Sequence, residues 1–307
     1  MATVSHQWAI VLAGGDGRRM ASVTRDACGG HVPKQFCRFG GETSLLELAI
    51  ERANQLVEPD HVVVVVQEAH RKWWEPALRG CLPGNILSQP SNRGTAVALL
   101  QGLAHSLEHD VDPYVVLLPS DQVVKDELLW HDTLVHACVA ATNHPDQLVV
   151  VGVAAQGDPH FGWLLPGVTS DDGTSTVKAF VEKPSTERAR ELAEHGALCS
   201  AFVLAGSVRA SLRLFHEYAA ELVWYYEDAL CHAGSVAPRF LDAYNHIPAT
   251  DFSRDILERA PGNMRVLRCP DCGWMDLGTP ERLERWIAQR EHACVPPVGS
   301  GALTLAA

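Results

Sequence analysis

Apolar runs alternate with amphipathic stretches along most of this chain. Some runs are short and almost wholly apolar, as expected of strands that are buried on both faces. These are Trp8–Leu12, His61–Gln67, Tyr114–Leu118, Leu148–Val153, Thr176–Val181 and Ser200–Leu204. Between them, helical spacing of apolar residues predicts helices over Ser44–Leu56, Thr95–Leu107, Leu128–His144, Ser185–His195, Val208–His216 and Pro280–Gln289. Strands that alternate with helices predict an α/β fold, with a mostly parallel sheet and helices on both of its faces.

Length and composition agree with such a fold. A chain of 307 residues is long enough for one large α/β domain or two smaller ones. Its hydrophobic fraction of 47% is ordinary for a folded soluble protein. The longest apolar run, Val62–Val66, is far shorter than the ~20 residues that cross a bilayer. The first residues also lack a basic stretch followed by an apolar core, so we expect a cytoplasmic protein without a membrane partner.

Charge and cysteine content narrow the possible partners. The formal net charge of −12 disfavours a nucleic acid or an anionic membrane as a partner. An acidic protein can still bind an anionic nucleotide where positive side chains converge locally. The nine cysteines are scattered and odd in number, which is more typical of free thiols than of disulfides in a chain without an export signal. Cys269 and Cys272 are the one close pair, and no further ligands at convincing spacing support a zinc site.

The strand Trp8–Leu12 leads into a turn that is rich in glycine. Three glycines lie in Gly14–Gly17, where they allow sharp turns and close approach of the backbone to a ligand. Arg18 and Arg19 follow at once, and Lys34 comes shortly after. Outward N–H groups and fixed positive charge together favour phosphate binding. The glycines alone are equally compatible with a plain strand-to-helix turn, and they match neither the dinucleotide fingerprint nor the Walker P-loop.

Two motifs in combination resemble those of a known family. Leu-Ala-Gly-Gly-x-Gly-x-Arg at Leu12–Arg19 and Pro-Lys-Gln-Phe at Pro33–Phe36 resemble the sugar-1-phosphate nucleotidyltransferases. The second motif is most similar to that of the mannose-1-phosphate guanylyltransferases. Further matches follow in the family's order at Arg93–Ala96, Leu118–Asp121, Phe161–Trp163, Val181–Pro184 and Gly273–Gly278. The resemblance therefore spans nearly the whole chain.

This resemblance implies a fold and a domain organisation. The implied fold is a Rossmann-like three-layer αβα arrangement of the nucleotide-diphospho-sugar transferase type, with a mostly parallel mixed sheet. Residues 1–293 would form a single domain, with a nucleotide-binding half at about 1–155 and a sugar-binding half at 156–293. Residues 294–307 would form a C-terminal tail.

The resemblance also implies a reaction. A sugar-1-phosphate, mannose-1-phosphate in the nearest group, would attack the α-phosphorus of a nucleoside triphosphate such as GTP, giving a nucleotide-sugar (GDP-mannose) and pyrophosphate. Because the nucleophile is already an anion, the reaction needs no general base and depends on cations and positioning. Two alternatives stay open: the same chemistry with another sugar or nucleotide, and a non-catalytic regulatory subunit that binds a nucleotide-sugar. A homodimer is compatible with either reading.

Individual residues receive roles from the matched motifs. The implied catalytic residues are Arg19, Lys34, Asp121 and Lys183. The implied nucleotide-binding residues are Leu12, Ala13, Gly14, Gly15, Gly17, Arg18, Gln89, Arg93, Gly94 and Thr95. The implied sugar-binding residues are Gly162, Glu182 and Ser200. Asp121 and Asp276 are the implied ligands of a Mg²⁺ cofactor, an ion that prefers carboxylate, phosphate and water oxygens.

The chain departs from the family pattern at two of these segments. Arg18 stands where the family usually has Thr or Ser, which adds charge to the glycine turn. Cys199 stands where relatives carry an Asn that contacts the sugar, and a thiol cannot supply the two donors and the acceptor of an amide. The identity of the sugar is therefore open at the sequence level.

Overall fold

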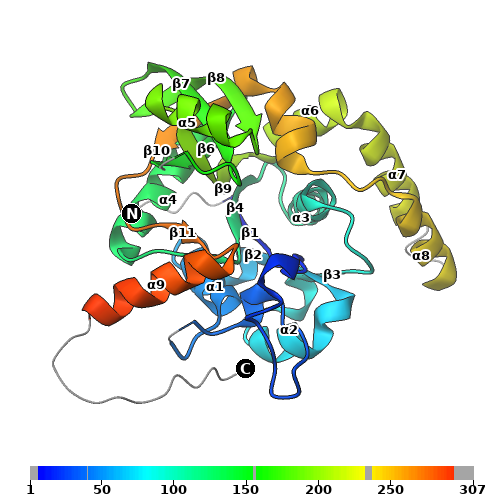
Figure 1. The fold of residues 1–307 in the computed structure, drawn as a ribbon. Helices are drawn as coiled ribbons and strands as arrows, with labels where there is room; N and C mark the ends of the chain where they lie inside the picture. Colours follow the sequence, from blue (N-terminus) through cyan, green and yellow to red (C-terminus); the bar gives the residue numbers. More distant parts are fainter. Residues whose placement is uncertain (1–5, 40, 155–156, 232–236, 294–307) are drawn as a thin grey trace.

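The computed structural model describes residues 6–39, 41–154, 157–231 and 237–293. A nine-stranded mixed sheet forms the centre of this part of the chain (Figure 1). In spatial order its strands are β3 (Ile86–Gln89), β2 (Val62–Gln67), β1 (Gln7–Leu12), β4 (Tyr114–Pro119), β9 (Leu198–Ser207), β6 (Leu148–Val153), β10 (Met264–Arg268), β8 (Thr174–Glu182) and β7 (Gly162–Thr169). β8 and β9 run opposite to the other strands of this sheet, so the sheet is mostly parallel in direction. A separate two-stranded ladder joins β5 (Gln122–Val123) to β11 (Met275–Asp276).

Helices cover both faces of the sheet and complete a three-layer fold. One apolar core includes residues of α3 (Thr95–His109), α6 (Val208–Tyr218) and α7 (Ala220–Cys231). The core on the opposite face includes residues of α1 (Leu45–Asn54), α2 (Arg71–Ala77), α4 (Glu127–Asn143) and α5 (Thr186–Glu194). α8 (Ala237–His246) packs against α7.

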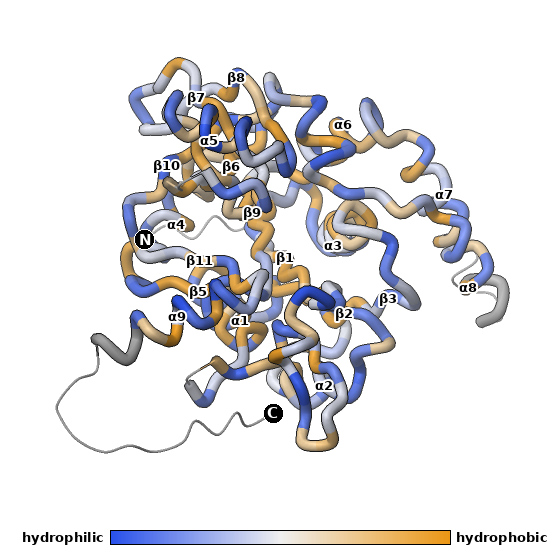
Figure 2. Tube along the Cα trace, in the orientation of Figure 1, coloured by the Kyte–Doolittle hydropathy of each residue, from blue (hydrophilic) through white to orange (hydrophobic). Residues whose placement is uncertain are grey.

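The strands are hydrophobic because both of their faces are covered. Val62–Val66 of β2 are all buried, between β1 and β3 and beneath helices on each face. Figure 2 shows hydrophobic residues concentrated along central strands such as β1 and β9. None of the helices in the described part of the chain combines the length and the apolar character needed to span a bilayer.

A third and smaller apolar cluster attaches the C-terminal helix α9 (Pro280–Ala293). Leu283 and Trp286 of α9 are buried together with Met20 and Leu45, which belong to the first part of the chain. The last helix therefore returns to the region of the glycine turn.

All of the predicted strands and helices are present, with ends that differ by a few residues. Ser185 caps α5 by accepting a hydrogen bond from the N–H of Arg188. The sequence pattern missed β3, β5, β7, β10, β11, α2, α7 and α8. β7 contains Pro166 at a shift in register and α2 contains Pro76, and prolines obscure the regular pattern of both element types.

The proposed division near residue 155 stays a prediction. Residues 155 and 156 lie outside the described residues, as does the predicted tail at 294–307.

Candidate active site

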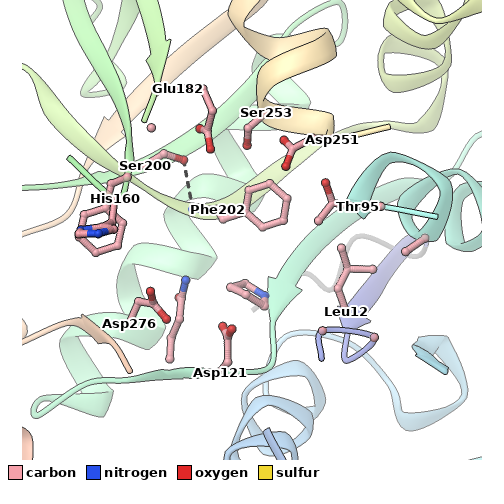
Figure 3. Close-up of a pocket in the computed structure, with 18 of the residues that line it drawn as sticks. Leu12, Thr95, Asp121, His160, Glu182, Ser200, Phe202, Asp251, Ser253 and Asp276 are labelled. Atoms are coloured by element: carbon pink, nitrogen blue, oxygen red, sulfur yellow. Dashed lines mark hydrogen bonds between the residues drawn. The ribbon is translucent and has the colours of Figure 1, made fainter. Parts of the chain in front are cut away.

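A cavity of about 410 Å³ opens at one edge of the central sheet. Leu12, Gln89 and Pro119 line it as the last residues of the parallel strands β1, β3 and β4, and Glu182 lines it from the end of β8, which runs in the opposite direction. This is the edge at which open α/β sheets bind ligands. In Figure 3, Asp121 and Asp276 lie on one side of the cavity and Glu182, Asp251 and Ser253 on the other.

Most of the predicted site residues line this cavity. They are Leu12, Gly14, Gly15, Arg19, Lys34, Gln89, Gly94, Thr95, Asp121, Gly162, Glu182, Lys183, Ser200 and Asp276. Gly17 and Arg18 line a second cavity of about 300 Å³ beside it, and Lys34 and Asp121 contribute to both cavities. Segments that are far apart in sequence therefore meet at one place.

Two predicted nucleotide-binding residues do not line either cavity. Ala13 is buried behind the glycine turn, where its N–H donates to the carbonyl of Val65. Arg93 donates instead to Oδ1 of Asn245 at 3.0 Å. Nucleotide binding by Ala13 and Arg93 therefore stays a prediction.

The glycine turn is held in place by the second motif. Nε2 of Gln35 donates to the carbonyl of Ala13 at 2.9 Å and to that of Gly15 at 2.8 Å. Gly17 has φ of 63°, and a Cβ there would lie 3.0 Å from the backbone nitrogen of Lys34. The two motifs therefore form one unit, in which glycine is required for both backbone conformation and space.

Lys34 lies between the two predicted metal ligands. Its Nζ is 2.7 Å from Oδ1 of Asp276 and 3.0 Å from Oδ2 of Asp121, and its side chain is only 9% exposed. Burial alone would lower the pKa of Lys34, but the two carboxylates outweigh it and raise the pKa. The lysine therefore carries a positive charge at neutral pH, held where anionic groups would enter.

The arrangement of the two aspartates fits a magnesium ion. Asp121 and Asp276 both line the cavity, and both contact the same nitrogen, so their oxygens lie close enough to converge on one small cation. Mg²⁺ commonly binds one or two protein carboxylates together with phosphate oxygens and water. Lys34 must move aside for both carboxylates to bind the ion directly.

Asp276 has a second positive neighbour that sequence reasoning missed. Nη1 of Arg282 donates to Oδ2 of Asp276 at 3.1 Å, and Nη2 donates to Oδ2 of Asp158 at 2.5 Å. Arg282 is buried at 6% exposure, although it follows the last matched motif and belongs to a helix rich in charged residues. Only the tertiary structure identifies it as part of the site.

The predicted nucleotide side contains a buried amide. Gln89 is buried, lines the cavity, and hydrogen-bonds through its side chain to Tyr244. Gly94 and Thr95 begin α3 beside it, with φ of 88° at Gly94. Thr250 packs so closely on Gly94 that a Cβ there would overlap the carbonyl oxygen of Thr250. An amide has two donor hydrogens and an acceptor oxygen, so Gln89 can still bind a polar group of a ligand.

The predicted sugar side is built from the end of β8 and the start of β9. Oε1 of Glu182 accepts a hydrogen bond from Nζ of Lys183 at 2.6 Å. Burial raises the pKa of Glu182, and Lys183 offsets this only in part. A Cβ at Gly162 would lie 2.6 Å from Oε2 of Glu182, so this glycine keeps space for the carboxylate.

Further residues on this side carry no motif that the sequence could reveal. Asp251 and Ser253 line the cavity from a π-helical segment, Phe252–Ile256, and its N-cap. Phe202 also lines it, with φ of 55°, a conformation that is unusual for an aromatic residue and is typical of functional sites. Its N–H donates to Oγ of Ser200 at 3.1 Å.

Cys199 does not contact this cavity. It has 0% exposure and belongs to the core beneath α4 and α5, whereas its neighbour Ser200 lines the cavity. The reason is the alternation of side chains along β9, which turns residues 199 and 200 to opposite faces. The expectation that position 199 faces the sugar is therefore wrong for this chain.

Comparisons with known proteins agree on one family. The sequence model of the nucleotidyl transferase family matches residues 8–292. A mannose-1-phosphate guanylyltransferase of Salmonella muenchen is 31% identical over 190 residues, which make up 60% of this chain and 39% of that protein. The chain thus matches well under half of the length of this relative.

Solved structures give the same result for the fold. A Thermus thermophilus protein described as a mannose-1-phosphate geranyltransferase superposes with a TM-score of 0.77 and 26% identity, covering 91% of this chain and 78% of that one. A UDP-glucose pyrophosphorylase in complex with UDP-glucose superposes with a TM-score of 0.60 and 14% identity, covering 94% and 100% of the two chains. These likenesses confirm the predicted nucleotide-diphospho-sugar transferase fold.

Proposed function

The chain belongs to the nucleotidyl transferase family, and from this we propose that it transfers a nucleotidyl group from GTP to mannose-1-phosphate, giving GDP-mannose and pyrophosphate. The observation that carries the proposal is the position of Lys34 between Asp121 and Asp276, in a cavity that also contains the glycine turn and Arg19. Two polyanions can meet only where fixed charges of this kind offset their repulsion.

The position of each residue in the cavity suggests its role in the reaction. Arg19 and the N–H groups of Gly14 and Gly15, which line the cavity, would hold the triphosphate at the end of β1. Lys34, buried and charged, would contact the phosphate at which substitution occurs. Because the attacking phosphate oxygen is already anionic, none of these groups has to remove a proton.

Mg²⁺ is part of the proposal. Asp121 and Asp276 would hold it, and it would supply positive charge next to the phosphates of the triphosphate. Lys34 would then be released from the carboxylates toward the phosphates, since one cation replaces another between the same oxygens.

Fewer observations support the choice of GTP and mannose-1-phosphate as the substrates. The Pro33–Phe36 form of the second motif and the name of the Salmonella relative both favour GTP and mannose-1-phosphate. On the sugar side, Glu182 can accept hydrogen bonds from two hydroxyl groups, and Lys183 can pair with the phosphate of the sugar. A regulatory subunit without catalysis has no evident need to keep a buried lysine between two carboxylates.

A grid assay tests this function. Purified protein is incubated with each common nucleoside triphosphate and with mannose-1-phosphate, glucose-1-phosphate or another sugar-1-phosphate, and pyrophosphate release is measured. We expect GTP with mannose-1-phosphate to be the best pair and excess EDTA to abolish release. A preference for UTP or dTTP with glucose-1-phosphate would refute the substrates, and full turnover in EDTA would refute the metal. Binding of GDP-mannose without any release would support the regulatory alternative.

A further inference from the structure

Arg282 connects two parts of the cavity wall that come from different regions of the chain. One arm of its guanidinium, Nη1, donates to Asp276, and the other, Nη2, donates to Asp158. The guanidinium carbon also lies 4.4 Å from the centre of the Phe161 ring. With both arms engaged and the plane stacked on a ring, the side chain has a single defined orientation.

The backbone of Arg282 is fixed on the nucleotide side. Its neighbour Leu283 and Trp286, one turn further along α9, are buried with Met20, the residue that follows Arg19. The guanidinium therefore extends from an element that is packed beneath the glycine turn.

Asp158 in turn organises the segment that leads into β7. Its Oδ1 accepts from the N–H of His160 at 2.9 Å, and its carbonyl accepts from Nε1 of Trp163 at 3.0 Å. Between these contacts lie Phe161 and Gly162, which line the cavity on the sugar side. The position of Asp158 thus sets the position of the sugar-side segment, residues 158–162.

We propose that Arg282 is a positioning residue that couples the sugar-side segment 158–162 to the metal-binding carboxylate of Asp276. This inference rests on the proposed function, because it assigns Asp276 to the metal and residues 158–162 to the sugar-1-phosphate. Arg282 holds Oδ2 of Asp276, so that Oδ1 points toward Lys34 and toward the place for the metal. A lysine could not replace it, since a single ammonium lacks the fork that reaches two carboxylates in fixed directions.

The alternative is an ion-pair network that stabilises the fold and has no part in the reaction. In that case a variant of Arg282 or Asp158 would lower only the stability. Its apparent kcat would fall in proportion to the folded fraction, and its KM values would not change. A role in positioning differs because it predicts separate effects at the two ends of the guanidinium. Loss of the Asp158 contact would affect sugar-1-phosphate, and loss of the Asp276 contact would affect metal binding.

Four variants test the two contacts of the Arg282 guanidinium separately. Arg282→Met removes the charge and the fork, Arg282→Lys keeps the charge but not the fork, and Asp158→Asn weakens the sugar-side contact alone. Arg285→Met is the matched control, because Arg285 lies on the exposed face of the same helix. For each protein we would measure the melting temperature, kcat, the KM of each substrate, and Mn²⁺ affinity of the free protein by electron paramagnetic resonance.

The expected pattern is specific. Arg282→Met and Arg282→Lys should weaken Mn²⁺ binding and lower kcat/KM for the sugar-1-phosphate by about 10- to 100-fold, as is usual when a ligand's orienting partner is lost. Asp158→Asn should raise the KM of the sugar-1-phosphate with Mn²⁺ affinity unchanged. The KM of the nucleotide should stay within about twofold in Asp158→Asn, and Arg285→Met should match the wild type.

Other results would overturn the inference. It fails if Arg282→Lys behaves as the wild type, or if Arg282→Met binds Mn²⁺ more tightly, since a purely electrostatic role predicts both. It also fails if Asp158→Asn leaves the KM of the sugar-1-phosphate unchanged. If the wild type releases no pyrophosphate from any substrate pair, the proposed function fails instead, and Mn²⁺ binding still tests the contact between Arg282 and Asp276.

Discussion

The ammonium nitrogen of Lys34 lies 2.7 Å from Oδ1 of Asp276, a residue 242 positions further along the chain. The same nitrogen is 3.0 Å from Oδ2 of Asp121. A buried lysine thus occupies the space between two carboxylates that would hold a metal ion. A metal ion bound there, as we propose, would compete with the ammonium of Lys34 for the same oxygens.

Replacement of Lys34 by Met tests this competition. Without the ammonium, Asp121 and Asp276 repel each other, and only Asp276 keeps a positive partner, Arg282, so the folded state loses stability. We expect the variant to have a lower melting temperature without metal, to regain part of it with Mn²⁺ or Mg²⁺, and to bind Mn²⁺ more tightly than the wild type. We also expect kcat to fall by about 100-fold or more, since a preorganised charge at the reacting phosphate is lost.

Thermal unfolding and Mn²⁺ titration check both parts of this prediction. Lys178→Met serves as the control, because Lys178 is exposed on β8. Unchanged Mn²⁺ affinity in Lys34→Met would show that the lysine does not compete with the metal.

Glu182 gives a prediction about pH. Burial raises the pKa of Glu182 above the ordinary value of 4.5. The carboxylate that would accept sugar hydroxyls is therefore protonated at a higher pH than an exposed glutamate is. As pH falls, we expect the KM of the sugar-1-phosphate to rise with a midpoint above pH 4.5, while the KM of the nucleotide changes little.

The raised pKa of Glu182 also determines how the stability of the fold changes with pH. Because the folded protein binds this proton more tightly than the unfolded chain does, ionised Glu182 costs stability once the pH is above its folded pKa. Glu182→Gln should remove the pH dependence of the sugar KM and raise that KM at neutral pH. A pH profile that is identical in the wild type and Glu182→Gln would exclude this carboxylate from the sugar site.

Local sequence signals account for much of the fold and for one part of the site. The strand at His61–Gln67 and the helix at Ser185–His195 follow from short-range rules, and the structure confirms both. Asp121 follows β4, as the direction of that strand predicts, whereas the pairing of β11 with β5 brings Asp276 beside it. The first placement follows from local sequence, and the second needs a contact between strands that are far apart in the chain.

The rest of the site depends on packing between distant elements. Arg282 reaches Asp276 only because Leu283 and Trp286 bring α9 back to Met20. Asp251 lines it because Thr250 packs on Gly94. No periodicity or motif in the sequence specifies contacts of this kind.

Two glycines at the nucleotide side should respond differently to the same substitution. In Gly94→Ala the new Cβ would overlap the carbonyl oxygen of Thr250, at a φ of 88° that disfavours alanine. We expect a clear loss of stability, of about 2 kcal/mol or more. In Gly15→Ala the Cβ meets no atom within 4 Å, so the fold should be unaffected.

The kinetic effect separates the roles of these two positions. Gly15 lines the cavity, so a methyl group there occupies space that the triphosphate would use, and the KM of the nucleotide should rise by about tenfold or more. Gly84→Ala is the control, since its Cβ is also unobstructed and the residue does not line the cavity. Equal nucleotide KM values in Gly15→Ala and Gly84→Ala would show that the glycine turn does not contact the nucleotide.

The last prediction concerns Cys199→Asn, which restores the residue that relatives carry at this position. Because Cys199 is fully buried in the core beneath α4 and α5, the new amide would face that core and would not reach the sugar. We expect the KM of mannose-1-phosphate to stay within about twofold of the wild type. A buried amide without partners costs about 1–3 kcal/mol, which should lower the melting temperature by several degrees. Cys138→Asn is the matched control, since Cys138 is buried in the same core on α4. If both variants lose stability and keep their KM values, position 199 does not reach the sugar. A lower KM in Cys199→Asn alone would show that position 199 does reach it.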